Sequence, residues 1–145
     1  MNNGIFIDTW GRLSLRDKKE DNHLEAVRLY KDYEKKGEAI YTTDYVMDET
    51  LTLFFKRLSP EAAKESMNLL FKAIEENRIQ LERITSERFY RTKELRERFM
   101  DKPEISFTDL SSTVVMQELK ISYIMTGDAH FGHVNLGFKT IPETP

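Results

Sequence analysis

The sequence predicts an α/β fold built on a mostly parallel β-sheet. Short apolar segments with the composition of buried strands alternate with longer segments whose apolar residues recur every three or four positions. Strands that alternate with helices in this way form parallel sheets with helices on both faces. A chain of 145 residues is about the length of one domain, so we expect residues 1–145 to share a single core.

The composition narrows the class of protein further. Hydrophobic residues make up 39% of the chain and charged residues 32%, which argues against disorder and low complexity. The absence of Cys excludes disulfides and thiolate metal ligands and is compatible with a reducing cytoplasm. We find no signal peptide and no apolar run of the ~18 residues needed to cross a bilayer, so we expect a cytoplasmic protein without membrane contact. The net charge of −3 argues against coating of nucleic acid by bulk attraction but not against a nucleic-acid enzyme.

The first expected strand ends in an acid. Residues 5–7 (Ile-Phe-Ile) have the apolar, β-branched composition of a buried strand, and Asp8 follows directly. Ligands of open α/β sheets bind beyond the carboxyl ends of the strands, so Asp8 is either a site residue or a cap. Residues 10–21 are expected to form a polar loop beside Asp8. The basic residues of this loop that are candidates for phosphate contacts are Arg12, Lys18 and Lys19.

The remaining elements follow from apolar periodicity and from cap residues. Helices are expected over residues 22–36, 45–58, 60–77, 86–99 and 108–120. Further strands are expected over residues 38–42, 78–85, 121–125 and 137–141, with 78–85 and 137–141 nearer the edges of the sheet. Thr42 or Thr43 can cap the helix that follows, and Thr108 is the candidate cap of the last helix.

The charged helix over residues 86–99 has two interpretations. Six basic residues lie between Arg83 and Arg98, which would suit a patch that binds RNA. Glu87 and Arg91, and likewise Glu94 and Arg98, are four residues apart, which is typical of paired charges on a solvated helix face. The second interpretation is favoured.

Four acids lie where the predicted topology would bring them to one edge of the sheet. Asp8 and Asp128 follow buried strands, Asp109 begins the last helix, and Glu49 lies one turn into the helix after the second strand. Each also has an ordinary structural explanation. Asp8 could cap a turn, Glu49 could pair with Lys56 or Arg57, Asp109 could stabilise a helix start, and Asp128 could be a turn residue.

Taken together, the four acids point to a cation site. Two carboxylates ~5 Å apart repel by about 3 kcal/mol at an effective dielectric constant near 20. Such a group persists by taking up protons or by binding cations, and an all-oxygen ligand set suits Mg²⁺ or Mn²⁺. Such ions can activate water and stabilise the transition state of phosphodiester hydrolysis.

Four motifs, in order along the chain, resemble those of the PIN-domain nucleases, with the closest likeness to VapC-type toxins of prokaryotic toxin–antitoxin pairs. These motifs are IFIDT from Ile5, DYVMDETLTLFF around Glu49, SFTD from Ser106 and TGDAHF from Thr126. The resemblance implies a three-layer α/β/α sandwich with a five-stranded parallel sheet. It also implies a Mg²⁺- or Mn²⁺-dependent endoribonuclease that forms homodimers and is inhibited by a small cognate antitoxin.

The resemblance also implies roles for single residues. Asp8, Glu49, Asp109 and Asp128 match the family's acidic quartet, in which the first and third acids are the firmest metal ligands. Thr9 and Thr108 match hydroxyls that orient neighbouring acids, and His130 falls in the TGDAHF motif, where it would orient the loop or touch phosphate.

Trp10 departs from the pattern, because the family usually has a small polar residue two positions after the first acid. Trp10 could stack on an RNA base, pack in the dimer interface or narrow the metal site, and we favour packing over stacking.

Other functions fit the sequence less well. His130 and His133 suggest zinc, but a catalytic zinc needs a third protein ligand and no third His is nearby. A haloacid-dehalogenase-like phosphotransferase needs an acid at position 10, where Trp10 stands. A receiver domain needs an acidic pair after the first strand and an Asp after the third, and a nucleotide-binding fold needs a glycine-rich turn. A PIN-like module that binds RNA or protein without catalysis remains the main alternative.

Overall fold

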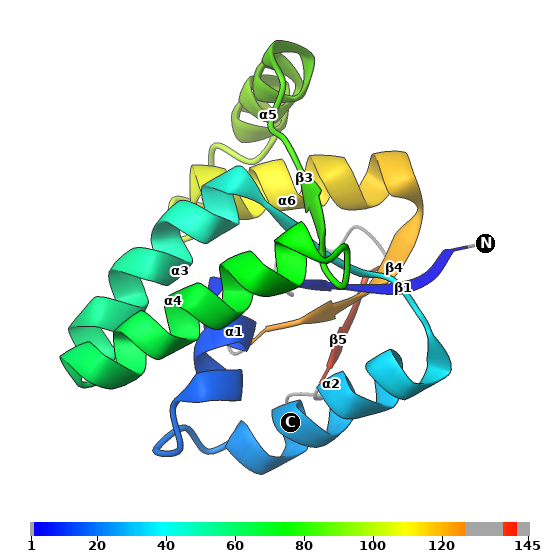
Figure 1. Ribbon diagram of the computed structural model, residues 1–145. Helices are drawn as coiled ribbons and strands as arrows, with labels where there is room; N and C mark the ends of the chain where they lie inside the picture. Colours follow the sequence, from blue (N-terminus) through cyan, green and yellow to red (C-terminus); the bar gives the residue numbers. More distant parts are fainter. Residues whose placement is uncertain (1, 127–137, 142–145) are drawn as a thin grey trace.

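The computed structural model describes residues 2–126 and 138–141, and its centre is a five-stranded parallel sheet. The strands are β1 (Asn2–Ile7), β2 (Ile40–Thr43), β3 (Gln80–Glu82), β4 (Ile121–Met125) and β5 (Lys139–Ile141). The helices within the described ranges are α1 (Thr9–Arg16), α2 (His23–Lys36), α3 (Asp44–Arg57), α4 (Pro60–Glu75), α5 (Ser86–Arg98) and α6 (Phe107–Leu119). The predicted α/β class and the two edge strands are confirmed (Figure 1).

The strands lie in the order β3-β2-β1-β4-β5, so the direction in which the chain adds strands to the sheet reverses at the central strand β1. The chain adds β2 and β3 on one side of β1 and then returns to add β4 and β5 on the other. The pairing of Ile7 with Met125 brings the carboxyl ends of β1 and β4 level with each other. Crevices at such switch points are where open α/β sheets bind ligands.

The two faces of β1 contact different helices, which gives the sheet its two covering layers. Ile5 and Ile7 belong to a core with residues of α1, α2, α3 and α4. Phe6 points to the other face, where it packs with Val115 and Met116 of α6. This alternation is the two-residue period of a strand buried on both faces.

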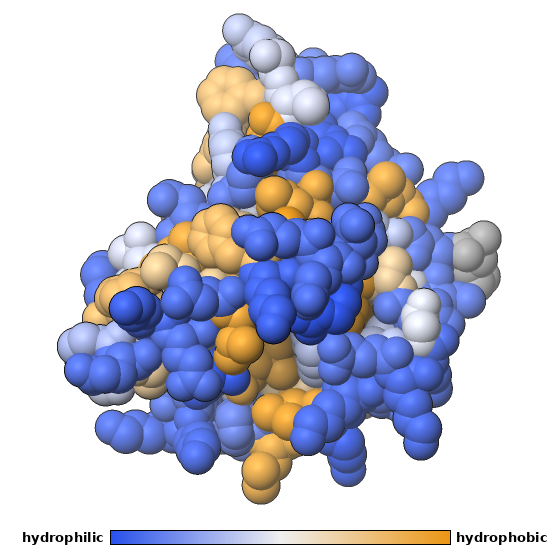
Figure 2. Space-filling view, in the orientation of Figure 1, coloured by the Kyte–Doolittle hydropathy of each residue, from blue (hydrophilic) through white to orange (hydrophobic). Residues whose placement is uncertain are grey.

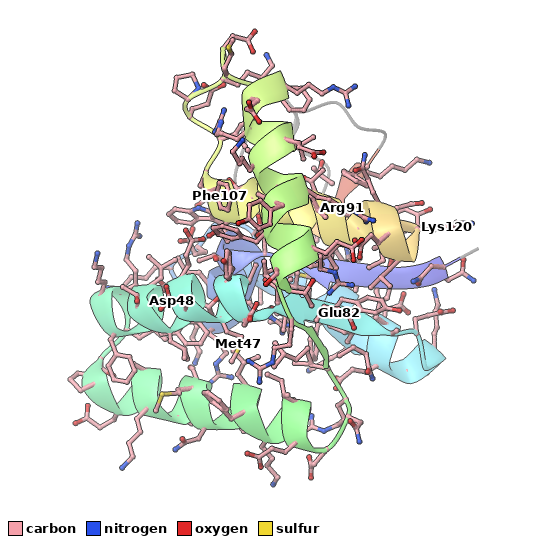
Figure 3. The ribbon with its side chains drawn as sticks, turned by 90° about the horizontal axis from the view of Figure 1, so that it is seen from above. Met47, Asp48, Glu82, Arg91, Phe107 and Lys120 are labelled. Carbon is pink, nitrogen blue, oxygen red and sulfur yellow. The ribbon has the colours of Figure 1, made fainter. Side chains whose placement is uncertain are left out.

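Helix α6 is the most deeply buried helix of the second layer. Residues 110–116 are all buried, because the sheet covers one side of the helix and α5 covers the other. Figure 3 shows α5 lying across α6, and in Figure 1 α5 stands above the rest of the molecule. Among the described residues, no helix is long and apolar enough to span a membrane.

The expectation of a polar loop over residues 10–21 is wrong, because Thr9–Arg16 forms α1. Asp8 caps this helix, and Leu13 is completely buried in the core. The helix is only eight residues long and contains Arg12, Ser14 and Arg16, so its apolar side is too short to stand out in the sequence.

The cap of α6 is also different from the prediction. Ser106, and not Thr108, is the N-cap residue, and its hydroxyl accepts a hydrogen bond from the Asp109 backbone N–H at 3.0 Å. Thr43, one of the two residues expected to cap α3, does so by accepting from the Val46 N–H.

Candidate functional site

Asp8 lies at the carboxyl end of β1, beside the end of β4. Its side chain is 2% exposed, and its backbone N–H donates to the Met125 carbonyl at 3.2 Å. Its Oδ1 accepts a hydrogen bond of 2.8 Å from the Gly11 N–H, so Asp8 is the N-cap of α1. An ionised carboxylate has about four acceptor positions, so capping a helix is compatible with binding a cation. The two interpretations of Asp8 therefore do not exclude each other.

Gly11 makes this close arrangement possible. A Cβ atom at this position would lie 2.3 Å from the Met125 carbonyl oxygen. The first turn of α1 therefore rests directly on the end of β4, and the Asp8 cap is fixed against both central strands.

Glu49 is joined to the start of α1 through Thr9. It is half-buried on α3, and its Oε1 accepts a hydrogen bond from the Thr9 hydroxyl at 3.2 Å. Since Thr9 follows Asp8 directly, the bond places Glu49 beside the end of β1.

Asp109 is held by its own helix start. It is the third residue of α6, and its Oδ2 accepts a hydrogen bond from the Ser106 backbone N–H at 3.4 Å. Together with the reciprocal Ser106 bond this forms a capping box, which fixes the carboxylate relative to the helix.

The chemistry of these side chains fits a hard cation, because every donor atom is a carboxylate or hydroxyl oxygen. Within residues 2–126 and 138–141, however, no three His, Cys, Asp or Glu side chains are grouped so that they could hold a metal ion. The fourth predicted acid, Asp128, and the supporting residue His130 lie outside the described residues, as does His133 of the zinc alternative. Among the described residues, therefore, Asp8, Glu49 and Asp109 do not form a three-ligand group.

A groove of about 350 Å³ runs beside Glu49, between α1 and α3. It is lined by Thr9, Trp10, Asp48, Glu49, Thr52, Leu53 and Lys56. Trp10 packs against the core from this groove while remaining partly exposed, and the Cζ of Arg57 lies 5.7 Å from the centroid of its ring. Trp10 thus packs within its own chain, and its place in a dimer interface stays a prediction. Its exposed part lies next to Glu49, Lys56 and Arg57.

Comparison with protein families gives a match to the PIN domain over residues 5–136. The chain belongs to the PIN-domain family. A search of curated proteins found no significant match.

Three solved structures, two of which contain VapC-type proteins by name, share the fold. VapC20 of Mycobacterium tuberculosis, a toxin that cleaves the sarcin–ricin loop, is 27% identical, with a TM-score of 0.76 over 93% of this chain and 96% of that one. VapBC2 of Rickettsia felis, bound to a DNA fragment from its promoter, is 16% identical, with a TM-score of 0.67 over 94% and 98%. PAE2754 of Pyrobaculum aerophilum is 14% identical, with a TM-score of 0.64 over 97% and 92%. The predicted VapC-type PIN fold is confirmed.

The three predicted phosphate contacts of this PIN domain lie in different environments. Lys18 and Lys19 are exposed in the turn after α1. Arg12 is not in an open loop as expected, because it belongs to α1 and is only 5% exposed. Burial is the largest influence on the pKa of Arg12 and lowers it, while the nearby Tyr30 and Asp8 act in the opposite direction.

Three features of this PIN domain's site were missed in the sequence. The Ser106-Phe-Thr-Asp109 segment has the spacing of a capping box and could have identified the correct cap. The need for Gly11 and the groove beside Trp10 depend on contacts between separate elements, so no local pattern signals them.

Proposed function

We propose that this protein is a metal-dependent endoribonuclease that hydrolyses RNA phosphodiester bonds and acts as the toxin of a type II toxin–antitoxin pair. The observation that carries the proposal is Asp8, buried at the switch point of a PIN-domain sheet with Glu49 held beside it through Thr9. The likeness to an RNA-cleaving toxin at 27% identity supports RNA as the substrate.

Asp8 and Asp109 are proposed as the principal ligands of Mg²⁺ or Mn²⁺, with Glu49 and Asp128 completing the set. Such an ion, when bound, lowers the pKa of water and stabilises the charge that develops on the phosphate. A thiolate-free oxygen ligand set supports a hard cation rather than zinc.

The residues of the chain would prepare the reaction by fixing these acids in advance. The Gly11 N–H holds Asp8, the Thr9 hydroxyl holds Glu49, and the Ser106 N–H holds Asp109. During hydrolysis a water oxygen bonds to phosphorus and the bond from phosphorus to the leaving ribose oxygen breaks. Glu49 or Asp128 would accept the proton of the attacking water, and the leaving ribose oxygen would take a proton from solvent water to become a hydroxyl. Lys56 and Arg57, near Trp10 and the groove beside Glu49, are proposed to contact the RNA backbone.

The partners proposed for this protein are an RNA substrate, a small antitoxin protein and a second copy of the chain in a homodimer. The VapC-type fold supports the antitoxin. The proposed setting is the cytoplasm, where an RNA substrate and a co-expressed inhibitor would both be present.

Cleavage of RNA by the purified protein tests the activity. Total RNA and a sarcin–ricin loop oligonucleotide would be incubated with Mg²⁺, Mn²⁺ or EDTA, and the cleaved ends mapped. We expect cleavage only with metal, and a loss of at least about 100-fold in Asp8→Asn and Asp109→Asn. Asp32→Asn is the matched control, because Asp32 is exposed on α2 and pairs only with Lys36 at 3.0 Å among the described residues. Full activity of Asp109→Asn, or cleavage unaffected by EDTA, would refute the assignment.

A catalytically silent PIN-like module that binds RNA or protein is the second candidate. The absence of a three-ligand group within the described residues favours it. The two candidates differ in metal binding. An enzyme should show a higher midpoint of thermal unfolding in Mn²⁺ that Asp8→Asn abolishes, whereas a silent module should show no such shift.

A further inference from the structure

Arg96 holds together the connection between α5 and α6, which comprises residues 99–106. The side chain of Arg96 is half-buried. Its guanidinium donates hydrogen bonds to three backbone carbonyls of the connection, those of Ile105 at 2.6 Å, Lys102 at 2.8 Å and Phe99. The three carbonyls are spread along the connection, so one side chain restrains its path from the end of α5 to the start of α6.

Apolar contacts restrain this region less than the rest of the core. Only two side chains of α5, Thr92 and Leu95, are buried. Figure 2 shows hydrophilic and hydrophobic side chains side by side over α5, at the top of the view. A small apolar cluster joins α5 to α6 and to the connection, and its buried members are Leu95, Ile105, Leu110 and Val114. Hydrogen bonds from a charged donor are stronger than those from a neutral one, so Arg96 adds a polar restraint to this cluster.

The bond from Arg96 to Ile105 leads directly to Asp109. The Ile105 carbonyl and the Ser106 N–H belong to the same peptide group. The carbonyl accepts from Nη1 of Arg96, and the N–H donates to Oδ2 of Asp109 at 3.4 Å. A peptide group is planar and almost always trans, so its C=O and N–H point in opposite directions. A guanidinium that fixes the carbonyl therefore also aims the N–H at the Asp109 carboxylate.

The bond from Ser106 to the Asp109 carboxylate is sensitive to the orientation of this peptide group. At 3.4 Å it is long for an N–H···O bond, and such bonds weaken steeply when the donor turns away. A cation on the carbonyl side also polarises the peptide group, which makes its N–H a better donor. The reciprocal bond to the Ser106 hydroxyl restrains the backbone of Asp109 and not its carboxylate. Rotation of the Ile105–Ser106 peptide would therefore remove one restraint on the carboxylate.

We propose that Arg96 is a positioning residue, which orients the Asp109 carboxylate for metal binding through the Ile105–Ser106 peptide group. The proposal rests on the proposed function, in which Asp109 is a ligand of Mg²⁺ or Mn²⁺. In this scheme Arg96 contacts neither RNA nor the metal. It acts on the carboxylate before a ligand binds, whereas an arginine with a purely structural role would change stability alone.

Titration calorimetry of the full chain with Mn²⁺ tests the proposal without RNA. Arg96→Met should weaken Mn²⁺ binding about 10-fold or more, because the Ser106 N–H is no longer aimed at Asp109. At a fixed Mn²⁺ concentration it should also lower kcat for RNA cleavage about 10- to 100-fold with little change in KM. Arg96→Gln, whose side chain is too short to reach the three carbonyls, should show the same loss and provides the test if Arg96→Met does not fold.

Arg88→Met is the matched control, because Arg88 also lies on α5 and donates to α6, but to Glu118 at the other end of that helix. It should lower the midpoint of thermal unfolding and leave Mn²⁺ affinity unchanged.

A second pair of variants tests the peptide link itself. Ser106→Pro and Ser106→Ala both remove the capping hydroxyl, but only proline also removes the N–H, and the φ of −74° at Ser106 is compatible with proline. Ser106→Pro should bind Mn²⁺ about 10-fold more weakly than Ser106→Ala. Adding Arg96→Met to Ser106→Pro should cause no further loss, since the group through which Arg96 acts is already gone.

Asp109→Asn separates failure of this proposal from failure of the proposed function. If Asp109→Asn abolishes Mn²⁺ binding while the Arg96 variants bind Mn²⁺ normally, only the role of Arg96 is refuted. An equal loss of Mn²⁺ affinity in Arg88→Met, or a further loss when Arg96→Met is added to Ser106→Pro, would refute it as well. If the unmodified chain does not bind Mn²⁺, or if Asp109→Asn binds it equally well, the proposed metal site fails and the role of Arg96 fails with it.

Discussion

The carboxylates at the sheet edge and the buried guanidinium of Arg12 differ in the hydrogen bonds that the chain provides to them, although Asp8 and Arg12 are only four residues apart. Asp8, Glu49 and Asp109 each accept a hydrogen bond from the chain itself. Arg12 is buried with two N–H-bearing atoms unpartnered among the described residues. Acids fixed by protein donors keep their positions before a ligand arrives, whereas the buried charge of Arg12 is favoured by its neighbours Tyr30 and Asp8. Substitutions should therefore affect the two regions differently.

The largest effect is expected from a substitution that displaces the first turn of α1, which holds Asp8 at the sheet edge. Gly11→Ala would place a Cβ 2.3 Å from a backbone oxygen that cannot swing away, and we expect a loss of about 3 kcal/mol or more in the free energy of unfolding. Gly37→Ala is the control, since Gly37 has φ +70° and no atom within 4 Å of the added Cβ, so only about 1 kcal/mol should be lost. Urea denaturation measures both. Equal stability of the two variants would show that α1 can move away from β4 at little cost.

Removal of the Thr9 hydroxyl should disturb Glu49 alone. Thr9→Val abolishes the 3.2 Å bond while keeping the shape of the side chain, and we expect kcat for RNA cleavage to fall about 10- to 100-fold with little change in KM. Thr9→Ser retains the hydroxyl and should restore most of the activity. If valine and serine variants have the same kcat, the bond does not position Glu49 for catalysis.

Arg88 and Arg12 should contribute differently to the free energy of unfolding. Arg88 donates to Glu118 at 2.8 Å and to Glu82 at 3.1 Å; burial lowers its pKa, but these bonds raise the pKa overall. Its side chain is 14% exposed. Arg88→Met should therefore lower the free energy of unfolding by about 1–2 kcal/mol, because it removes the partner of the half-buried Glu82 and leaves Glu118 with Arg91 alone. Arg12→Met should cause no loss. Urea denaturation of both variants is the measurement, and a larger loss for Arg12→Met would mean that Arg12 is paired in solution.

The sequence was sufficient to predict the order of the sheet elements and the acids that follow them. Strand and helix periods are local, so residues 121–125 and most of the long helices were predicted within a few residues. Because parallel strands end at one edge, Asp8 could be placed at that edge without knowledge of any contact. The motifs then led to the PIN family, which the comparisons confirmed.

What could not be predicted depends on contacts between distant segments. The burial of Arg12 results from α2 and α4 closing over α1, and arginine is an exposed residue in most proteins. The Thr9–Glu49 bond joins residues 40 positions apart, and the role of Gly11 appears only when α1 rests on β4. The wrong prediction of the α6 cap is different, because Ser106 and Asp109 already have the spacing of a capping box in the sequence.

The smallest expected effect concerns the two cations that remain exposed beside α1. Arg12 is too deeply buried for RNA backbone contacts, so Lys18 and Lys19 are the remaining candidates among the three. Replacing both with Gln should weaken RNA binding only a few-fold and reduce the slope of log K against log salt by about 0.7 per lost phosphate contact. Lys35 and Lys36, exposed at the end of α2, give a control double variant with the same change in net charge. If the slope falls equally in both double variants, bulk charge and not a local contact governs RNA binding, and the turn after α1 is not part of the RNA surface.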